Sequence, residues 1–294
     1  MIVVTTPTGM IGRQVLDNLL AVGAPVRMIV RDAARLAPSI RERVDIVEGS
    51  HGDGATVDRA FAGAEAVFWL PPPNPRAASL EAAYLDFTRP ASAALRQHGV
   101  ARVVAVSALG RGTDMAARAG HVTASLAMDD MIAETGVSFR ALTMPSFMDN
   151  VLRQVVAIRD HGVFSSPLDG DRRHPTCATR DIAAVAARLL LDPTWSGQES
   201  LAVLGPEDLS FEEMAATMAS VLGKPVRFQQ VPFPAFRDQL SGFGMSEAVV
   251  QGMVDMMAAK NAGLDDAEPR TPDNTTPTSF RRWCEDVLKP AVLG

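Results

Sequence analysis

Lysine and tyrosine are scarce in this sequence. Its 294 residues include three lysines, Lys224, Lys260 and Lys289, and a single tyrosine, Tyr84. The first two hundred residues contain no lysine, so their fixed positive charge belongs to arginine. A mechanism that needs a lysine ammonium, whose pKa shifts readily on burial, is therefore excluded from that part of the chain.

Cysteine and long apolar runs are also lacking. Cys177 and Cys284 form neither a spaced metal-binding pair nor a disulfide framework, which is typical of a reducing compartment. No apolar run approaches the roughly 20 residues that span a bilayer. The chain starts with Ile2, Val3 and Val4, which predict a buried strand and not a secretory signal. We predict a cytoplasmic protein without a metal site or a membrane segment.

The charge balance is acidic. Lysine and arginine number 28 against 34 aspartates and glutamates, which leaves a net charge of −6. This balance argues against a broad electrostatic surface for nucleic acid. A hydrophobic share of 47% is sufficient for a real core. We therefore predict a globular protein that does not bind nucleic acid.

The first half of the chain alternates short β-branched runs with helical patterns, which is typical of βαβ units and a parallel sheet. Strands are predicted at residues 2–5, 26–30, 44–47, 66–70, 103–107 and 138–143. A helix follows the first strand, because Ile11, Val15, Leu16, Leu19 and Leu20 fall on one helical face. Gly23 is expected to end that helix.

The pattern changes near residue 150. We expect a helix at "RDIAAVAARLLLDP", capped by Asp181, and then a strand over residues 200–204. Ser210 and Glu213 have the spacing of a capping box, and Gly223 is expected to end the helix that they begin. Residues 261–278 are polar and contain proline, which predicts a loop or linker. A last helix is expected over residues 279–288.

These patterns predict an α/β fold, a Rossmann-type doubly wound parallel sheet with a smaller, mostly helical C-terminal substrate domain. The Rossmann domain is expected over residues 1–150, with about 176–205 returning to it. Residues 151–175 and 206–294 are expected to form the smaller domain.

The stretch "TTPTGMIG" follows the first predicted strand and opens the first predicted helix. Its spacing fits G-x-x-G-x-x-G, with Thr6 in the place of the first glycine, Gly9 in the second and Gly12 in the third. Such a turn offers free backbone amides and the positive end of a helix dipole to a pyrophosphate. Thr8 adds a hydroxyl and Met10 an amide. A dinucleotide site is predicted here, and the alternative is an ordinary strand-to-helix turn.

The end of the second predicted strand indicates which dinucleotide is bound. An acidic residue there would bind the ribose diol of NAD, whereas arginine can pair with the 2′-phosphate of NADP. Arg31 occupies the position, and Arg35 lies one helical turn further. NADPH is therefore expected, with NAD as the less favoured cofactor. In the alternative, Arg31 is solvated and Asp32 only caps the second helix.

The sequence resembles the NmrA-like family of atypical short-chain dehydrogenase/reductases nearly from end to end. The stretches that carry the resemblance are "TPTGMIG", "VRDAARL", "VVAVSALG", "TMPSFMDN", "TRDIAAVAARLLLDP", "VLGPEDLSFEEMA", "LGKPVRFQQVP" and "TTPTSFRRWCEDVLKPAV". The resemblance implies a Rossmann domain and a small C-terminal domain with a substrate cleft. It also implies either a reductase of quinones, dyes and related conjugated acceptors or a regulator that binds the dinucleotide without turnover.

The resemblance assigns residues by position. Those implied to line the cofactor are Thr6, Thr8, Gly9, Met10, Ile11, Gly12, Arg31, Leu70, Pro71, Ser107, Pro145, Ser146 and Phe147. Residues 51–53 match, more loosely, a segment that borders the adenine. Phe147 and Asn150 are implied to face the substrate, and the alternative for Phe147 is core packing.

The proton chemistry of typical short-chain dehydrogenases is missing. These enzymes use a tyrosine and a lysine four residues later, and here His121 and Ser125 stand at the matching positions. Met144 replaces the usual arginine of the family. His121 is the candidate proton donor, and either Ser107 or Asn150 could orient it. His121 and Ser107 are therefore the catalytic candidates. The alternative for His121 is a hydrogen-bonded residue at a helix start.

Two functions follow from these assignments. The first is an NADPH-dependent oxidoreductase that transfers hydride to a quinone-like or conjugated aromatic small molecule, whose delocalised anion needs little help with protonation. Residues 233–263 offer methionine and phenylalanine side chains for such a ligand, or else form a helical core stripe. The alternative function is a non-catalytic NADP(H)-binding redox sensor that regulates a protein partner. A homodimer is compatible with either function.

Overall fold

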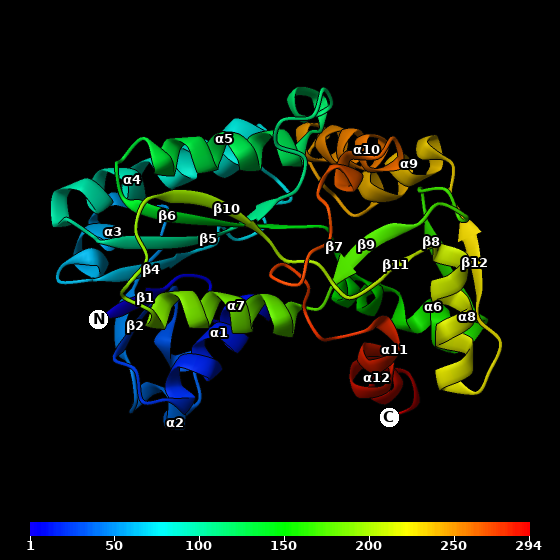
Figure 1. Cartoon of the computed structure of the whole chain (residues 1–294), viewed down its shortest axis with the longest axis horizontal. Helices are drawn as coiled ribbons and strands as arrows, with labels where there is room; N and C mark the ends of the chain where they lie inside the picture. The colour runs from blue at the N-terminus through cyan, green and yellow to red at the C-terminus, as the bar shows by residue number, and fades with distance from the viewer. The chain divides into compact units, whose positions relative to one another are not determined.

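The main sheet contains seven strands in the order β10-β6-β5-β4-β1-β2-β3 (Figure 1). Pairing is parallel between β1 and β2, β1 and β4, β2 and β3, and β4 and β5. The chain runs outward from β1 to β3 and then returns to the other side of β1 at β4. Ligands of such doubly wound sheets bind where the strand order reverses, at the carboxyl ends of the strands. The reversal here lies between β1 and β4.

The strands are β1 (Ile2–Val4), β2 (Val26–Val30), β3 (Asp45–Glu48), β4 (Ala66–Trp69), β5 (Arg102–Ala108), β6 (Ser138–Met144) and β10 (Gln198–Ala202). Each predicted strand is present, with its ends shifted by no more than a residue or two. This agreement confirms the predicted fold class.

The computed structural model describes all residues, 1–294. The chain forms two compact units, and each unit is built from three separate segments of the chain. The first, called the sheet unit, comprises residues 1–108, 124–143 and 182–201. The second unit comprises residues 109–123, 144–181 and 202–294.

Helices cover both faces of the main sheet (Figure 1): α3, α4 and α5 lie on one face, and α1 and α7 on the other. The helical segments here are α1 (Met10–Ala21), η1 (Ala33–Arg35), α2 (Pro38–Arg41), α3 (Gly54–Phe61), η2 (Ala82–Asp86), α4 (Phe87–His98), α5 (His121–Ala133) and α7 (Thr179–Leu191). The five predicted apolar residues of α1 are all buried, and Gly23 follows with φ +70°. Helical periodicity and a glycine stop thus predicted this helix correctly.

The second unit contains two small sheets, one in the order β11-β9-β7 and one that pairs β12 with β8. Its elements are η3 (Ala116–Arg118), β7 (Ser146–Phe147), η4 (Met148–Gln154), α6 (Val155–His161), β8 (Val163–Ser166), β9 (His174–Cys177), β11 (Asp208–Leu209), α8 (Phe211–Leu222), β12 (Arg227–Gln230), α9 (Phe233–Gly242), α10 (Glu247–Asn261), η5 (Leu264–Ala267), α11 (Phe280–Trp283), η6 (Cys284–Leu288) and α12 (Lys289–Leu293). None of the helices in the chain combines the length and apolar character that crossing a membrane requires.

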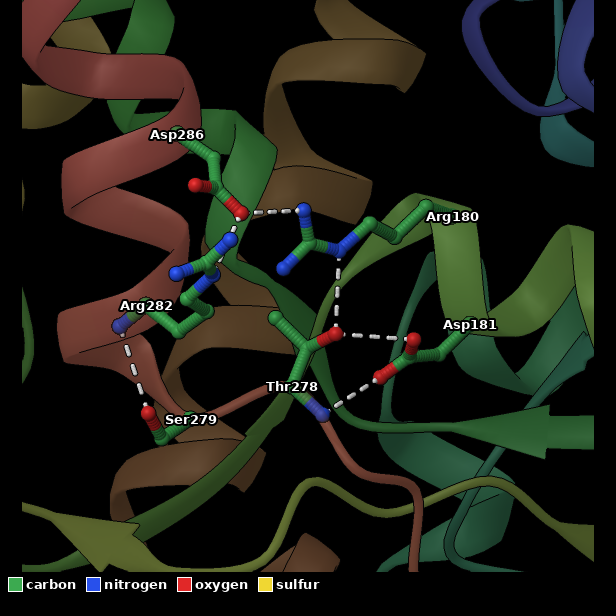
Figure 2. Close-up of polar contacts among 6 residues, drawn as sticks. All are labelled: Arg180, Asp181, Thr278, Ser279, Arg282 and Asp286. Carbon is green, nitrogen blue, oxygen red and sulfur yellow. Dashed lines mark hydrogen bonds and ion pairs between the residues drawn. The ribbon is translucent and has the colours of Figure 1, made fainter.

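Capping predictions in this unit had mixed outcomes. The capping box of Ser210 and Glu213 is present, and Gly223 ends α8 with φ +66°. The prediction that Asp181 caps its helix was wrong. Asp181 lies inside α7, and its carboxylate accepts hydrogen bonds from the backbone N–H of Thr278 at 3.0 Å and from its hydroxyl at 2.8 Å (Figure 2).

The same network corrects the picture of residues 261–278 as a plain loop. Arg180 donates to the Thr278 hydroxyl at 3.0 Å and to the carboxylate of Asp286 at 2.8 Å (Figure 2). These bonds join α7 to the segment that precedes α11 and to η6. Asn274, Thr276 and Thr278 are buried. A segment that reads as polar linker is therefore fixed in place, because its side chains and backbone find partners far away in sequence.

Candidate functional site

The turn between β1 and α1 contains an unusual threonine. Thr6 has φ +52°, the left-handed region that favours glycine, and no other non-glycine residue of the chain shares it. Its hydroxyl donates to the carbonyl oxygen of Leu70 at 2.5 Å. The backbone therefore adopts the shape expected of the first glycine, and a side-chain hydrogen bond to the end of β4 holds it there.

The two glycines of this turn leave no room for side chains. A Cβ on Gly9 would lie 2.9 Å from Cγ2 of Thr6, and a Cβ on Gly12 would lie 2.1 Å from the carbonyl oxygen of Thr6. Gly12 thus permits the close approach of helix and strand that the third glycine of a dinucleotide-binding turn provides. The turn has the cradle that a pyrophosphate requires.

The first turn of α1 presents unsatisfied backbone donors. The first hydrogen bond of the helix runs from the N–H of Arg13 to the carbonyl oxygen of Gly9 at 2.9 Å, so the amides of Met10, Ile11 and Gly12 precede it. The Gly9 amide itself donates inward to the Thr6 carbonyl oxygen at 3.0 Å. No side chain caps the helix, and its first turn holds no acidic residue. Such an end favours an anion.

Hydrogen bonds join the ends of β1 and β4 beside this turn. The Thr5 hydroxyl donates to the carbonyl oxygen of Phe68 and accepts from the N–H of Leu70, both at 2.9 Å. The predicted cofactor residues Leu70 and Pro71 follow directly and are half-buried. The structure therefore brings them together with Thr6, at the point where the strand order reverses.

His51 lies beneath the same turn, between β3 and α3. Its Nε2 is 3.2 Å from the carbonyl oxygen of Leu70 and 3.4 Å from the Thr6 hydroxyl. The rings of Trp69 and Phe87 meet the imidazole edge to face. Burial lowers the pKa of His51 to about 4, and the nearby charge of Arg31 acts in the same direction. A neutral imidazole therefore braces the turn.

Arg31 directly follows β2, and its exposed guanidinium has no hydrogen bond or ion pair within the chain. Asp32 accepts from the N–H of Ala34 at 2.9 Å and so caps η1, as the alternative proposed. Glu48 takes the next amide, that of Ala33, at 2.7 Å. The local carboxylates are thus occupied by backbone amides, which leaves the guanidinium available to a ligand.

A buried polar pair lies where β5 meets α5. The Ser107 hydroxyl donates to the carboxylate of Asp129, and their exposures are 7% and 2%. Asp129 was missed in the sequence analysis. A signal was present, because Asp129 follows Ser125 by one helical turn on the face that also carries Met128 and Ile132, where an acidic residue is out of place.

His121, the candidate proton donor, begins α5 and belongs to the second unit. Burial lowers its pKa, which a hydrogen bond to the backbone of Val249 in α10 opposes. The preceding Gly120 has φ +54°, and a Cβ there would lie 2.1 Å from the carbonyl oxygen of Gly252. The start of α5 is therefore packed tightly on α10, with the imidazole bonded at that contact.

The remaining predicted site residues, at positions 145–147 and 150, also lie in the second unit. Ser146 and Phe147 form β7, which pairs in parallel with β9 and is half-buried. Pro145 is buried before it, and Asn150 is exposed after it. Asp149 accepts from the N–H of Thr179 at 2.9 Å and anchors this loop to the start of α7. The residues predicted to face the substrate therefore stand on a well-held segment.

The chain is similar over most of its length to known proteins. The sequence model of the NmrA-like family matches residues 1–283. An NAD(P)H azoreductase of Xenophilus azovorans is 29% identical over 274 residues, 92% of each chain. A (4-alkanoyl-5-oxo-2,5-dihydrofuran-3-yl)methyl phosphate reductase of Streptomyces griseus subsp. griseus is 33% identical over 247 residues, 82% of this chain and 80% of that protein. The solved structure of an NADPH-dependent quinone oxidoreductase from Escherichia coli, complexed with NADPH, matches with a TM-score of 0.75 and 23% identity, covering 91% of this chain and 92% of that chain.

Proposed function

The chain belongs to the NmrA-like family, and from this premise we propose that it is an NADPH-dependent reductase of a quinone-like or conjugated aromatic small molecule. The observation that carries the proposal is the turn between β1 and α1. Thr6 adopts a glycine-like backbone there, and Gly12 lies against its carbonyl group. An ordinary strand-to-helix turn needs neither feature.

NADPH fits the residues of the sheet unit. The amides of Met10, Ile11 and Gly12 would hold its pyrophosphate, and the free guanidinium of Arg31 would pair with its 2′-phosphate. When bound, NADPH supplies a hydride. Arg31 would favour NADPH over NADH, because NADH lacks the 2′-phosphate that the guanidinium can bind bidentately.

The proposed substrate class rests on the relatives and on the missing proton chemistry. The three relatives are named as reductases of an azo compound, an unsaturated lactone and a quinone, which share a conjugated electron-poor double bond. Hydride addition to such a bond gives a delocalised anion, so a weak donor suffices. His121 is the proposed donor, and Phe147 with Asn150 are the proposed substrate residues. The protein's main contribution is then orientation at near-attack distance.

A panel of acceptors tests this proposal. Purified protein with NADPH is offered quinones, azo dyes and unsaturated lactones, and the loss of NADPH absorbance is followed. We expect oxidation above the blank with at least one class and a slower reaction with NADH. Binding of NADPH without oxidation of any acceptor would favour the sensor alternative, which the names of the relatives do not support. Absence of binding at millimolar dinucleotide would exclude both.

A further inference from the structure

Ser107 and Asp129 form a polar contact inside an apolar layer. Val103 and Ala105 precede Ser107 on the same face of β5, and Met128 and Ile132 flank Asp129 on α5; all four belong to the core between sheet and helices. A buried carboxylate in such surroundings is costly to retain without a partner. The Ser107 hydroxyl supplies one, donating its proton to Oδ2 of Asp129.

The register of the sheet places this pair near the proposed cofactor site. Trp69 of β4 stands opposite Ala105 of β5 in a parallel pair. Continued by two residues along both strands, this register puts Ser107 level with Pro71. Ser107 thus stands at the carboxyl ends of the strands, beside the segment that follows β4, where ligands of doubly wound sheets bind.

The direction of the hydrogen bond determines what Ser107 can bind. The Ser107 hydroxyl has a single proton, and its hydrogen bond directs that proton to Oδ2 of Asp129. Only lone pairs of the Ser107 oxygen then remain for a ligand. The ligand group that meets Ser107 must therefore be a hydrogen-bond donor.

We propose that Asp129 is a positioning residue, which orients Ser107 as the acceptor for the carboxamide amino group of the nicotinamide. The inference rests on the proposed function. Quinone oxygens and azo nitrogens carry lone pairs and no proton, so they cannot bond to an oxygen that offers only lone pairs. Ser107 therefore serves the cofactor, and the proton that completes reduction comes from elsewhere.

Binding of a cofactor analogue tests the proposal without turnover. In the reduced 3-acetylpyridine analogue of NADPH a methyl ketone replaces the carboxamide, so the amino donor is absent. Dissociation constants of both dinucleotides are measured by their fluorescence. We expect wild type to bind NADPH about tenfold more tightly than the analogue, the usual worth of one hydrogen bond. Ser107→Ala and Asp129→Ala, which removes the acceptor of the Ser107 proton, should reduce this ratio to about one, and Ser107→Thr, which keeps the hydroxyl, should retain it.

Two matched variants control for damage to the fold. Ser92→Ala removes another buried serine hydroxyl of the sheet unit, and Asp181→Asn alters a buried carboxylate of the second unit. Both should keep the wild-type ratio even where they lower the melting temperature. If Asp129→Ala does not fold, Ser107→Ala still decides the matter.

Each remaining outcome contradicts the proposal in a distinguishable way. A wild-type ratio near one, or an unchanged ratio in Ser107→Ala, overturns the assignment of Ser107 while NADPH binding itself leaves the proposed function standing. Failure of wild type to bind NADPH at all removes the proposed function, and the role of Asp129 with it.

Discussion

Lys260 and Asp265 form an ion pair that water hardly reaches, with side-chain exposures of 7% and 3%. Lys260 lies in the last turn of α10, and Asp265 lies in the short helix η5 that follows. One of the three lysines of the chain is therefore used inside the second unit, where each charge depends on the other. Breaking a buried pair is costly, whereas replacing it whole with apolar residues often is not.

Lys260→Met should therefore lower the free energy of unfolding by about 3–5 kcal/mol, because it strands the Asp265 carboxylate. The double variant Lys260→Met with Asp265→Leu should recover most of that loss. Urea unfolding monitored by circular dichroism measures both. Lys289→Met, whose side chain is exposed, is the control and should change stability by less than about 1 kcal/mol. Equal losses in the single and double variants would show that the pair is not coupled.

Gly12→Ala should weaken NADPH binding by about 10- to 100-fold, as expected for 1–3 kcal/mol of overpacking. The added methyl group would lie 2.1 Å from the Thr6 carbonyl oxygen, so either the turn or α1 must move. Calorimetric titration with NADPH measures the change. Gly54→Ala is the matched control, since a Cβ there meets nothing within 4 Å. Unchanged NADPH affinity in Gly12→Ala would show that the pyrophosphate does not bind at this turn.

Arg31→Ala should abolish most of the preference for NADPH over NADH. A hydrogen-bonded charge of this kind contributes about 1.5–3 kcal/mol, so the ratio of the two dissociation constants should fall about 10- to 100-fold. The affinity for NADH itself should hardly change. Arg41→Ala, which removes an exposed arginine of α2, controls for net charge. A similar fall in that control would mean that the preference comes from long-range charge and not from Arg31.

His51 should make stability fall in mild acid. Its pKa is about 4 in the fold against 6.5 when unperturbed, so between these values the unfolded chain binds a proton that the folded chain does not. The contribution is fully present above the unperturbed pKa and declines by about 1.4 kcal/mol per pH unit as the pH falls toward the folded value. His51→Gln should be flatter than wild type across this window in denaturant titrations. The exposed His161→Gln serves as control, and an equal slope in His51→Gln and wild type would contradict the prediction.

His121→Gln distinguishes the two roles of that residue. Because the proposed acceptors yield delocalised anions, and because burial already lowers the pKa of His121, we expect kcat to fall less than about tenfold. The melting temperature should fall as well, since the ring is bonded to the backbone of Val249. Initial rates measured across pH 5 to 8 check this expectation. A positioned general acid that is essential to the reaction raises the rate by about 100- to 10,000-fold. A loss in that range, together with a vanished pH dependence, would contradict this expectation, because it would show that turnover depends strongly on the proton from His121.

Local features of the molecule were determined by the sequence itself. The strands of the main sheet, the helix after the first strand and the capping box of Ser210 with Glu213 depend on side-chain periodicity and on contacts a few residues apart. The same holds for the turn at Gly9 and Gly12, where a strand, two glycines and a helix are contiguous. Such features follow from short-range sterics and hydrogen bonding, which a sequence displays directly.

Only the tertiary structure decided which distant groups became partners. The Ser107 hydroxyl meets Asp129, the Thr6 hydroxyl meets the end of β4, and Asp181 turns from its own helix toward Thr278. In each case a polar group is buried and must find a hydrogen bond, but the strand order and helix packing determine which partner is within reach. A local pattern shows that such a group needs a partner, whereas the three-dimensional neighbourhood selects it.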